Sequence, residues 1–414
     1  MPAPVVTLLG VLLLIAVREV GPVRIAIWQG MAAGAVVVLA GGWISLPAAA
    51  HAIDWQVMLF LFGVFLIGHA LETSGWLAML AHRLFRGARS THGLVWRLLV
   101  GAAAASALLM NDTLAIIATP VALGLARRHH IDPKLLLLTL AFAITIGSVA
   151  SPVGNPQNLL IAIHSGLAAP FAAFASHLLL PTLVNLGVAY GVLRISFRRE
   201  FHATRLVHTV QPVDDPALAR LAGICVVLLA ALIAAKAVTV RLLPAASPPL
   251  SALALAAATP LLAFSPRRLE LVRGIDWRTL VFFAALFVLM GAVWDTGFIQ
   301  AQLARLGLDP TWPPAVLAVS ALVSQLISNV PMVALYLPVL AHHQASVPAL
   351  MALAAGSTIA GNLLLLGAAS NIIIVQQAER RAGVLVSFVE FARLGIPLTA
   401  LNLGVYWLAM HWHL

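Results

Sequence analysis

The chain has 414 residues, of which 62% are hydrophobic and only 9% charged. Its mean hydropathy of +1.01 excludes a soluble globular domain, because a bilayer core is what requires apolar stretches of about 20 residues per crossing. The net charge of +10 does not indicate nucleic-acid binding, because Lys and Arg lie at the ends of apolar runs, where they face headgroups and cytoplasm. The lone Cys225 excludes a disulfide framework and a cysteine-based metal site.

Apolar runs predict ten long helices, which follow one another in two sets. The first run, from Val5 to Val17, lacks a basic n-region and is interpreted as a helix, not a signal peptide. Placing the basic clusters in the cytoplasm sets the orientation of every crossing and leaves both termini outside. The helices are expected near 5–18, 25–45, 55–72, 134–165 and 171–195, and then near 218–240, 249–265, 278–294, 347–378 and 388–411.

Two further apolar segments do not fit as single crossings. The segment 93–127 carries Arg clusters at both ends, so one crossing would leave a cluster on the wrong side. A re-entrant hairpin from the cytoplasm satisfies both ends and places Asn111-Asp112-Thr113 at its tip. The segment 312–341 has almost no charge at either end and is expected to dip in from outside, with Ser328-Asn329 at its tip. Backbone of this kind is tolerated where protein or water surrounds it.

The two sets of helices are related by internal repetition. Thr145 and Thr358 are 213 residues apart, and the same spacing separates Gly154 from Gly367 and Asn158 from Asn371. The matches Asn111/Asn329 and Asp54/Asp276 keep the same order at spacings of 218 and 222 residues. Paired, interrupted polar motifs in two halves of an apolar chain are typical of secondary transporters. Five crossings and one hairpin per repeat is an odd count, so the second repeat must be inverted.

The sequence therefore predicts an all-α polytopic membrane protein of two inverted-topology repeats. The first repeat is 1–199, with its hairpin at 93–127 and a broken helix at 134–165. A cytoplasmic linker follows at 200–217. The second repeat is 218–414, with its hairpin at 312–341 and a broken helix at 347–378.

The breaks in the two long helices are expected to hold the binding site. Prolines and a glycine interrupt the first around Gly154-Asn155, four residues before Asn158, and the second is expected to unwind around Gly367, Ser370 and Asn371. Unwinding frees carbonyls that suit a cation and helix N-termini that suit an anion. The alternative is that these polar residues only join helices or satisfy kinked backbone. Four polar clusters arranged as two inverted pairs favour a site.

Asp112 is the one carboxylate that this topology places well inside the membrane. An intramembrane carboxylate costs about 2.5–3.5 kcal/mol on insertion scales and is therefore a candidate functional residue. It could bind Na⁺, carry a proton, or accept hydrogen bonds at the hairpin tip. A Na⁺ site is considered at Asn111, Asp112 and Asn158, and no cofactor other than a coupling Na⁺ or H⁺ is expected.

The two tips resemble known signatures. Asn111-Asp112-Thr113 and Ser328-Asn329-Val330, each with a proline nine residues after the Asn, are similar to the Ser-Asn-Thr signatures of divalent anion–sodium symporters. The Asn-Asp pair resembles the tip of arsenite permeases and sodium–proton antiporters of the same ion transporter superfamily. The resemblance covers essentially the whole chain, which differs from the carboxylate symporters at Met110-Asn111-Asp112 and at Val330. It implies an elevator-type carrier with a mobile transport domain and a scaffold that forms a homodimer.

The predicted function is that of a permease for a small inorganic or organic anion, such as an oxyanion, in a bacterial-type inner membrane, surrounded by lipid and coupled to Na⁺ or H⁺. A sodium–proton antiporter that uses Asp112 is the alternative transport function. An intramembrane enzyme is the alternative from another class. The chain lacks HExxH, GxSxG and paired intramembrane carboxylates, which disfavours the enzyme.

Overall fold

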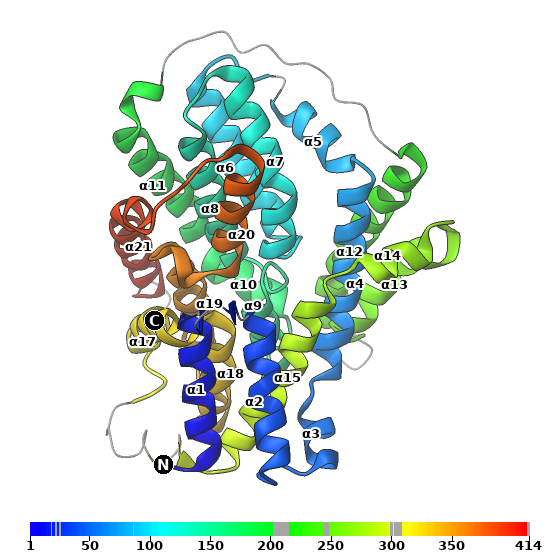
Figure 1. Ribbon diagram of the computed structural model, residues 1–414, viewed down its shortest axis with the longest axis vertical. Coiled ribbons are helices and arrows are strands. Elements are labelled where there is room, and N and C mark those ends of the chain that lie inside the picture. The colour runs from blue at the N-terminus through cyan, green and yellow to red at the C-terminus, as the bar shows by residue number, and fades with distance from the viewer. Residues whose placement is uncertain are drawn as a thin grey trace.

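The computed structural model is almost entirely helical (Figure 1) and describes residues 1–17, 19–20, 23–24, 26–85, 87–201, 215–242, 248–298, 301 and 309–411. Two two-residue strands, β1 (Glu19–Val20) and β2 (Val23–Arg24), pair antiparallel between the first two helices. The helices of the first half are α1 (Ala3–Val17), α2 (Ile27–Ala40), α3 (Leu46–Ala52), α4 (Trp55–Thr73), α5 (Trp76–Phe85), α6 (Thr91–Ser106), α7 (Asn111–His129), α8 (Pro133–Val149), α9 (Pro156–His164), α10 (Pro170–Phe174) and α11 (Leu180–Ser196). A π-helical turn (Ala175–Leu179) joins α10 to α11, and a 3₁₀ turn (Arg198–Glu200) follows α11.

The second half has a matching order of long helices. They are α12 (Pro216–Leu242), α13 (Leu250–Phe264), α14 (Arg268–Gly274), α15 (Trp277–Trp294), α17 (Pro313–Ile327), α18 (Asn329–His342), α19 (Val347–Ile359), α20 (Ala369–Ala382) and α21 (Phe388–His411). Two 3₁₀ turns, Ala360–Asn362 and Leu365–Gly367, lie between α19 and α20. Most of the expected linker 200–217 falls outside the described residues, and α12 already begins at Pro216.

The helices pack in two groups, and each group takes members from both halves. In the peripheral group, α4 packs against α12 and α13, while α15 packs against α1 and α2. In the central group, α6 and α7 pack on α8, α17 and α18 pack on α19, and α7 lies along α20. Figure 1 shows α6 and α7 toward one end of the long axis and α17 and α18 toward the other. The halves are therefore interleaved, and a hairpin-like helix pair from each lies at opposite ends.

Local sequence explains where the matched helices begin and end. Asp54 caps α4 by accepting hydrogen bonds from the amides of residues 56 and 57, and Asp276 caps α15 by accepting from the Thr279 amide at 3.1 Å. Each helix is followed by a glycine with positive φ, Gly75 at 75° and Gly297 at 66°, where the left-handed backbone favours glycine. The Asp and Gly matches noted in the sequence are thus the start and stop signals of equivalent helices.

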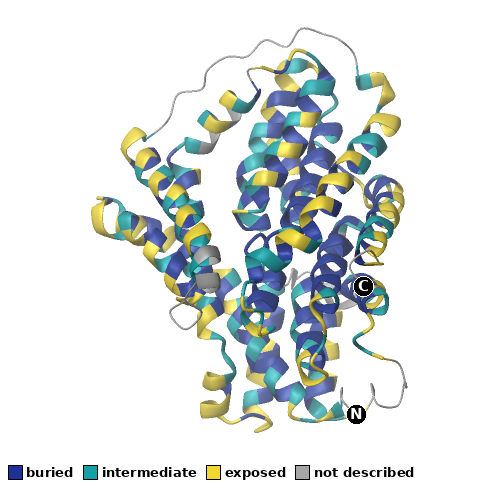
Figure 2. Cartoon of the chain, turned by 180° about the vertical axis from the view of Figure 1, so that it is seen from behind, coloured by how far each residue is buried: buried dark blue, intermediate teal, exposed yellow. Residues whose placement is uncertain are grey.

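Burial follows the division into groups. Figure 2 shows dark-blue residues concentrated in the helices at the middle of the molecule and yellow residues along the outer helices. All 15 residues of α8 from Leu135 to Val149 are buried, whereas α12 and α13 expose large apolar side chains such as Ile224, Val227 and Phe264. Five helices among the described residues are long and apolar enough to cross a membrane: Trp55–Thr73, Pro170–Ser196, Pro216–Lys236, Trp277–Trp294 and Phe388–His411.

Three short helices were not expected from the apolar runs. The run predicted at 25–45 ends at Ala40, and α3 follows as a separate helix, because Ser45 caps a new start and proline occupies its first turn. The amphipathic α5 and the charged α14 lie between long apolar helices. Their apolar residues are too few or too dispersed to produce a continuous hydrophobic run.

Candidate functional site

The first long segment is interrupted between Val149 and Pro156. Asn155 caps α9 by accepting a 2.8 Å hydrogen bond from the Asn158 amide, and proline at the first helical position starts the helix without a lost donor. Gly154 is required by close packing: a Cβ there would lie 2.7 Å from the Ser106 carbonyl oxygen and 2.9 Å from the Ser148 Cα. The break therefore presses against the end of α6.

The second long segment is interrupted without proline. Between Ile359 and Ala369 the chain makes two 3₁₀ turns, so the break begins at Ala360, upstream of the expected Gly367. A Cβ on Gly367 would lie 2.8 Å from the Ala360 carbonyl oxygen and 3.2 Å from Gln325 Oε1. Glycine is thus needed where the break folds back against α17.

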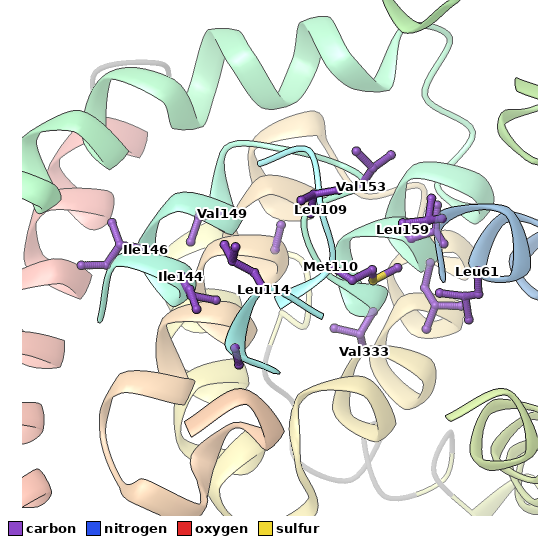
Figure 3. Packing of buried hydrophobic residues seen from close by; sticks show 14 of the residues in the cluster. Leu61, Leu109, Met110, Leu114, Ile144, Ile146, Val149, Val153, Leu159 and Val333 are labelled. Carbon is purple, nitrogen blue, oxygen red and sulfur yellow. The ribbon is translucent and has the colours of Figure 1, made fainter. Parts of the chain in front are cut away.

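The two tips lie beside the two breaks. The chain turns between the end of α6 and Asn111, and again at Ser328 between α17 and α18. Ser328 has φ 72° and ψ 161°, a conformation that side chains other than glycine rarely adopt. Figure 3 shows Leu109 and Met110 of the first tip in the buried apolar cluster that also contains Val153 and Val333. The tips therefore pack in protein interior.

One contact is repeated in both halves. The Asn158 side-chain amide donates to the carbonyl oxygens of Ser148 and Ser151 at 3.0 Å, and the Asn371 amide donates to the Gly361 carbonyl at 2.7 Å. Each asparagine lies on the second half-helix and reaches a carbonyl ten residues back, at the end of the first. The bland interpretation of these residues thus holds for their nitrogens, which satisfy carbonyls near the breaks.

The side-chain oxygens differ between the halves. In the first half, Ser106 Oγ lies 2.7 Å from Asn111 Oδ1, and Asn111 Nδ2 donates to Ser148 Oγ at 3.2 Å. Asn155 Nδ2 donates to Ser148 Oγ at 3.1 Å and to Thr358 Oγ1 at 3.2 Å. We call this the closed cluster. Its members are Ser106, Asn111, Ser148, Asn155, Asn158 and Thr358, and all are at most 9% exposed.

The second half contains a contrasting set, which we call the open cluster. Each of its members has a buried side-chain oxygen with no hydrogen-bond partner among the described residues: Thr145, Ser324, Gln325, Asn329, Ser370 and Asn371. Ser324 and Asn329 are the counterparts of Ser106 and Asn111, yet the bond made in the first half is not made in the second. Thr358 donates to Asn158 Oδ1 at 3.3 Å, while the counterpart atoms on Thr145 and Asn371 are both unpaired.

The remaining predicted residues lie around these clusters. Thr113 faces the peripheral group, because a Cβ on Gly68 of α4 would lie 2.7 Å from Thr113 Cγ2. Asp112 is partly exposed in the first turn of α7, a helix N-terminus that favours negative charge. The Asp276 carboxylate is close enough to interact with it electrostatically. The structure thus brings Asn111, Gly154, Asn155 and Asn158 into one cluster, but directs Thr113 away from it.

An ion pair joins the central and peripheral groups. His164, at the end of α9, contacts Asp54, the N-cap of α4. Burial alone would raise the pKa of Asp54, but the hydrogen bond and charge of His164 and the two capping amides hold it below 3.8. Asp54 is 11% exposed and His164 49% exposed. The carboxylate is therefore ionised at neutral pH and positioned to hold α9 against α4.

The sequence contained one more repeat, which the analysis above did not use. Residues 182–190, TLVNLGVAY, match 399–407, TALNLGVYW, at a spacing of 217 residues. In the structure Asn402 Nδ2 donates to Asn185 Oδ1 at 2.8 Å, and Asn185 Nδ2 donates to the Asn402 carbonyl at 3.3 Å. The matched polar spacing would have identified this buried contact between α11 and α21. It would likewise have identified Ser106 and Ser324, which share the spacing of the tip asparagines.

The comparisons with known proteins agree with the membrane architecture. A family model described as "Citrate transporter" matches residues 2–349. The chain belongs to the citrate transporter family. Members of this family are transporters, so this chain is an integral, multi-pass membrane transporter.

Relatives of this citrate transporter family member span its full architecture. A Mycobacterium tuberculosis protein described as an uncharacterized transporter is 32% identical, over 85% of each chain. The "46 kDa membrane protein" of Mycobacterium leprae is 31% identical, over 86% of each. The human P protein is 27% identical, over 96% of this chain and 58% of its own. The YdaH transporter of Alcanivorax borkumensis shares the fold, with a TM-score of 0.59 at 18% identity over 99% and 98% of the two chains.

Proposed function

We propose that this protein is a secondary permease that moves a small anion across a bacterial inner membrane, driven by Na⁺ or H⁺. The observation that carries the proposal is the convergence of four helix N-termini on the two polar clusters. Helices α7, α9, α18 and α20 begin at Asn111, Pro156, Asn329 and Ala369, and the contacts of Thr358 with Asn155 and Asn158 join the two halves there. Helix N-termini favour anions, because their amide groups are unpaired and their dipoles are positive.

A carboxylate such as citrate is the first substrate to test, since the family description names citrate. Small inorganic oxyanions are the second, because the Asn-Asp tip resembles that of arsenite permeases. The test is uptake by purified protein in proteoliposomes across a panel of these anions, with Na⁺ and pH gradients imposed separately. Concentrative uptake of one anion supports the proposal. Na⁺/H⁺ exchange without any anion would instead support the antiporter.

The proposed transport cycle is alternating access between two inverted repeats. The interleaving of the halves and the placement of α6–α7 and α17–α18 toward opposite ends support it. In an elevator, the central group would move and the peripheral group would form the dimeric scaffold. The ion pair between Asp54 and His164 would be one contact that must break as the groups slide.

Cysteine labelling tests the hairpins. Starting from Cys225→Ala, single cysteines at the exposed positions Arg89 and Arg127 should both label only from the cytoplasm, since a hairpin between them does not cross. Cysteines at Asp309 and His343 should both label only from outside. Labelling of either pair from opposite faces would show that the intervening segment is a crossing, and the inverted-repeat proposal would fail.

Asp112 is the proposed coupling residue. Its counterpart in the second tip is Val330, so one tip offers a carboxylate and the other does not. Asp112→Asn should retain the fold and substrate exchange but lose dependence on the driving gradient. Uptake measured against imposed Na⁺ and pH gradients decides this. Accumulation that follows the gradient as in the parent protein would exclude Asp112 from coupling.

A further inference from the structure

The open cluster contains acceptors whose orientation is fixed. Gln325 Nε2 donates to the Ala360 carbonyl at 2.7 Å, and Asn371 Nδ2 donates to the Gly361 carbonyl at 2.7 Å. A carbonyl only accepts, so the nitrogen of each amide must face it and the oxygen must face the other way. Gln325 Oε1 and Asn371 Oδ1 are therefore buried acceptors without a donor among the described residues. An anion would be repelled by these oxygens.

The open cluster gathers around Gly361. A Cβ there would lie 3.4 Å from Thr145 Cγ2 and 3.8 Å from Asn329 Nδ2, and Gly367, whose own Cβ would lie 3.2 Å from Gln325 Oε1, is in contact with it. Asn371 binds the Gly361 carbonyl itself. Side chains from α8, α17, α18 and α20 thus meet at one point, and their oxygens are neutral.

Sequence differences between the halves explain why one cluster is closed and the other open. In the first half, Ser148 and Asn155 accept from or donate to the other polar side chains. Their counterparts 213 residues later are Gly361 and Ala368, which have no polar side-chain atom. The acceptors of the second half have therefore lost the partners that close the first. A buried oxygen left unpaired costs free energy unless a ligand satisfies it.

We propose that the protein binds one monovalent cation of the Na⁺ class at the open cluster and none at the closed cluster. Gln325, Asn329, Asn371 and Thr145 provide its side-chain oxygens. A divalent ion is disfavoured, because the described residues contain no group of three His, Cys, Asp or Glu side chains and the cluster is neutral. The assignment deepens the proposed function, since it names the coupling ion and its place. It replaces the Na⁺ site considered at Asn111, Asp112 and Asn158, because Asn111 and Asn158 are already paired within the protein.

The test is Na⁺ binding by the purified full-length protein in detergent without any anion. Equilibrium dialysis with radioactive Na⁺ should give one ion per chain. The apparent melting temperature should rise with NaCl, against choline chloride at constant ionic strength, and saturate. Absence of Na⁺-specific binding, or two ions per chain, would overturn the assignment. Because no transport is measured, a chain that binds Na⁺ but moves no anion would refute the permease and leave the cation site standing.

Counterpart residues supply matched control variants. Ser324→Ala and Thr145→Val should raise the Na⁺ concentration for half-maximal stabilisation about tenfold, with little change in melting temperature in choline. Ser106→Ala and Thr358→Val remove the equivalent groups from the closed cluster. They should lower the melting temperature in choline and leave the Na⁺ concentration for half-maximal stabilisation unchanged. If Ser106→Ala weakens Na⁺ binding as much as Ser324→Ala, the two clusters are equivalent and the proposal fails.

Discussion

Replacing Asn158 or Asn371 with alanine removes the same atoms from counterpart positions, yet the structure predicts unequal losses of stability. Asn158 Nδ2 reaches the carbonyls of Ser148 and Ser151 at 3.0 Å, and its Oδ1 accepts from Thr358 at 3.3 Å. Asn371 Nδ2 makes one such bond, and its Oδ1 makes none to a described residue. At about 1 kcal/mol per net hydrogen bond, Asn158→Ala should cost about 3 kcal/mol and Asn371→Ala about 1 kcal/mol.

The measurement is the free energy of unfolding, or the apparent melting temperature, of both variants in one detergent without Na⁺. Asn158→Ala should be the less stable by about 2 kcal/mol, and a significant part of its transport loss should reflect loss of folded protein. Asn371→Ala should remain folded and still lose transport. Equal destabilisation, or a larger loss for Asn371→Ala, would refute the division into a closed and an open cluster.

Three further predictions concern single contacts. Asp54→Asn keeps a good helix cap but removes the charge facing His164, so it should lower the melting temperature at pH 7, and the deficit should vanish as pH falls below 3.8, because a lowered carboxyl pKa stabilises the fold only where the group is ionised. Ser328→Gly should raise the melting temperature, by relieving about 1 kcal/mol of backbone strain, and a decrease would show that the tip is unstrained. Asn185→Ala and Asn402→Ala should each destabilise the protein, and a double-mutant cycle should give a coupling energy of about 1–2 kcal/mol; additive losses would contradict the reciprocal contact.

Much of the architecture was readable from the sequence because each signal is local. Asp54 and Asp276 start helices by capping, and the proline at 152 interrupts one wherever it lies. The family assignment agrees with the resemblance seen at the two tips. The break at Ala360 was placed too far downstream, because it depends on glycine packing against Gln325 and not on a helix-breaking residue.

The inequality of the two polar clusters was not readable. Asn158 and Asn371 are identical residues at matched positions, so the sequence treats them alike. Their difference arises from neighbours that only folding brings together. Thr358 reaches Asn158 from 200 residues away, and no counterpart reaches Asn371. Polar satisfaction is a property of three-dimensional neighbours, and a linear repeat does not encode it directly.

The reciprocal contact between Asn185 and Asn402 has the form that a residue near a twofold axis makes with its own copy. A half-length ancestor that assembled with a second copy of itself would have placed one asparagine of each copy there. Fusion of the two genes released each copy to change alone, and the binding residues diverged, as Ser148 and Gly361 illustrate. The segments 182–190 and 399–407 remain close to one another in sequence. The ancestral interface has thus been preserved as an internal seam, while specialisation occurred on either side of it.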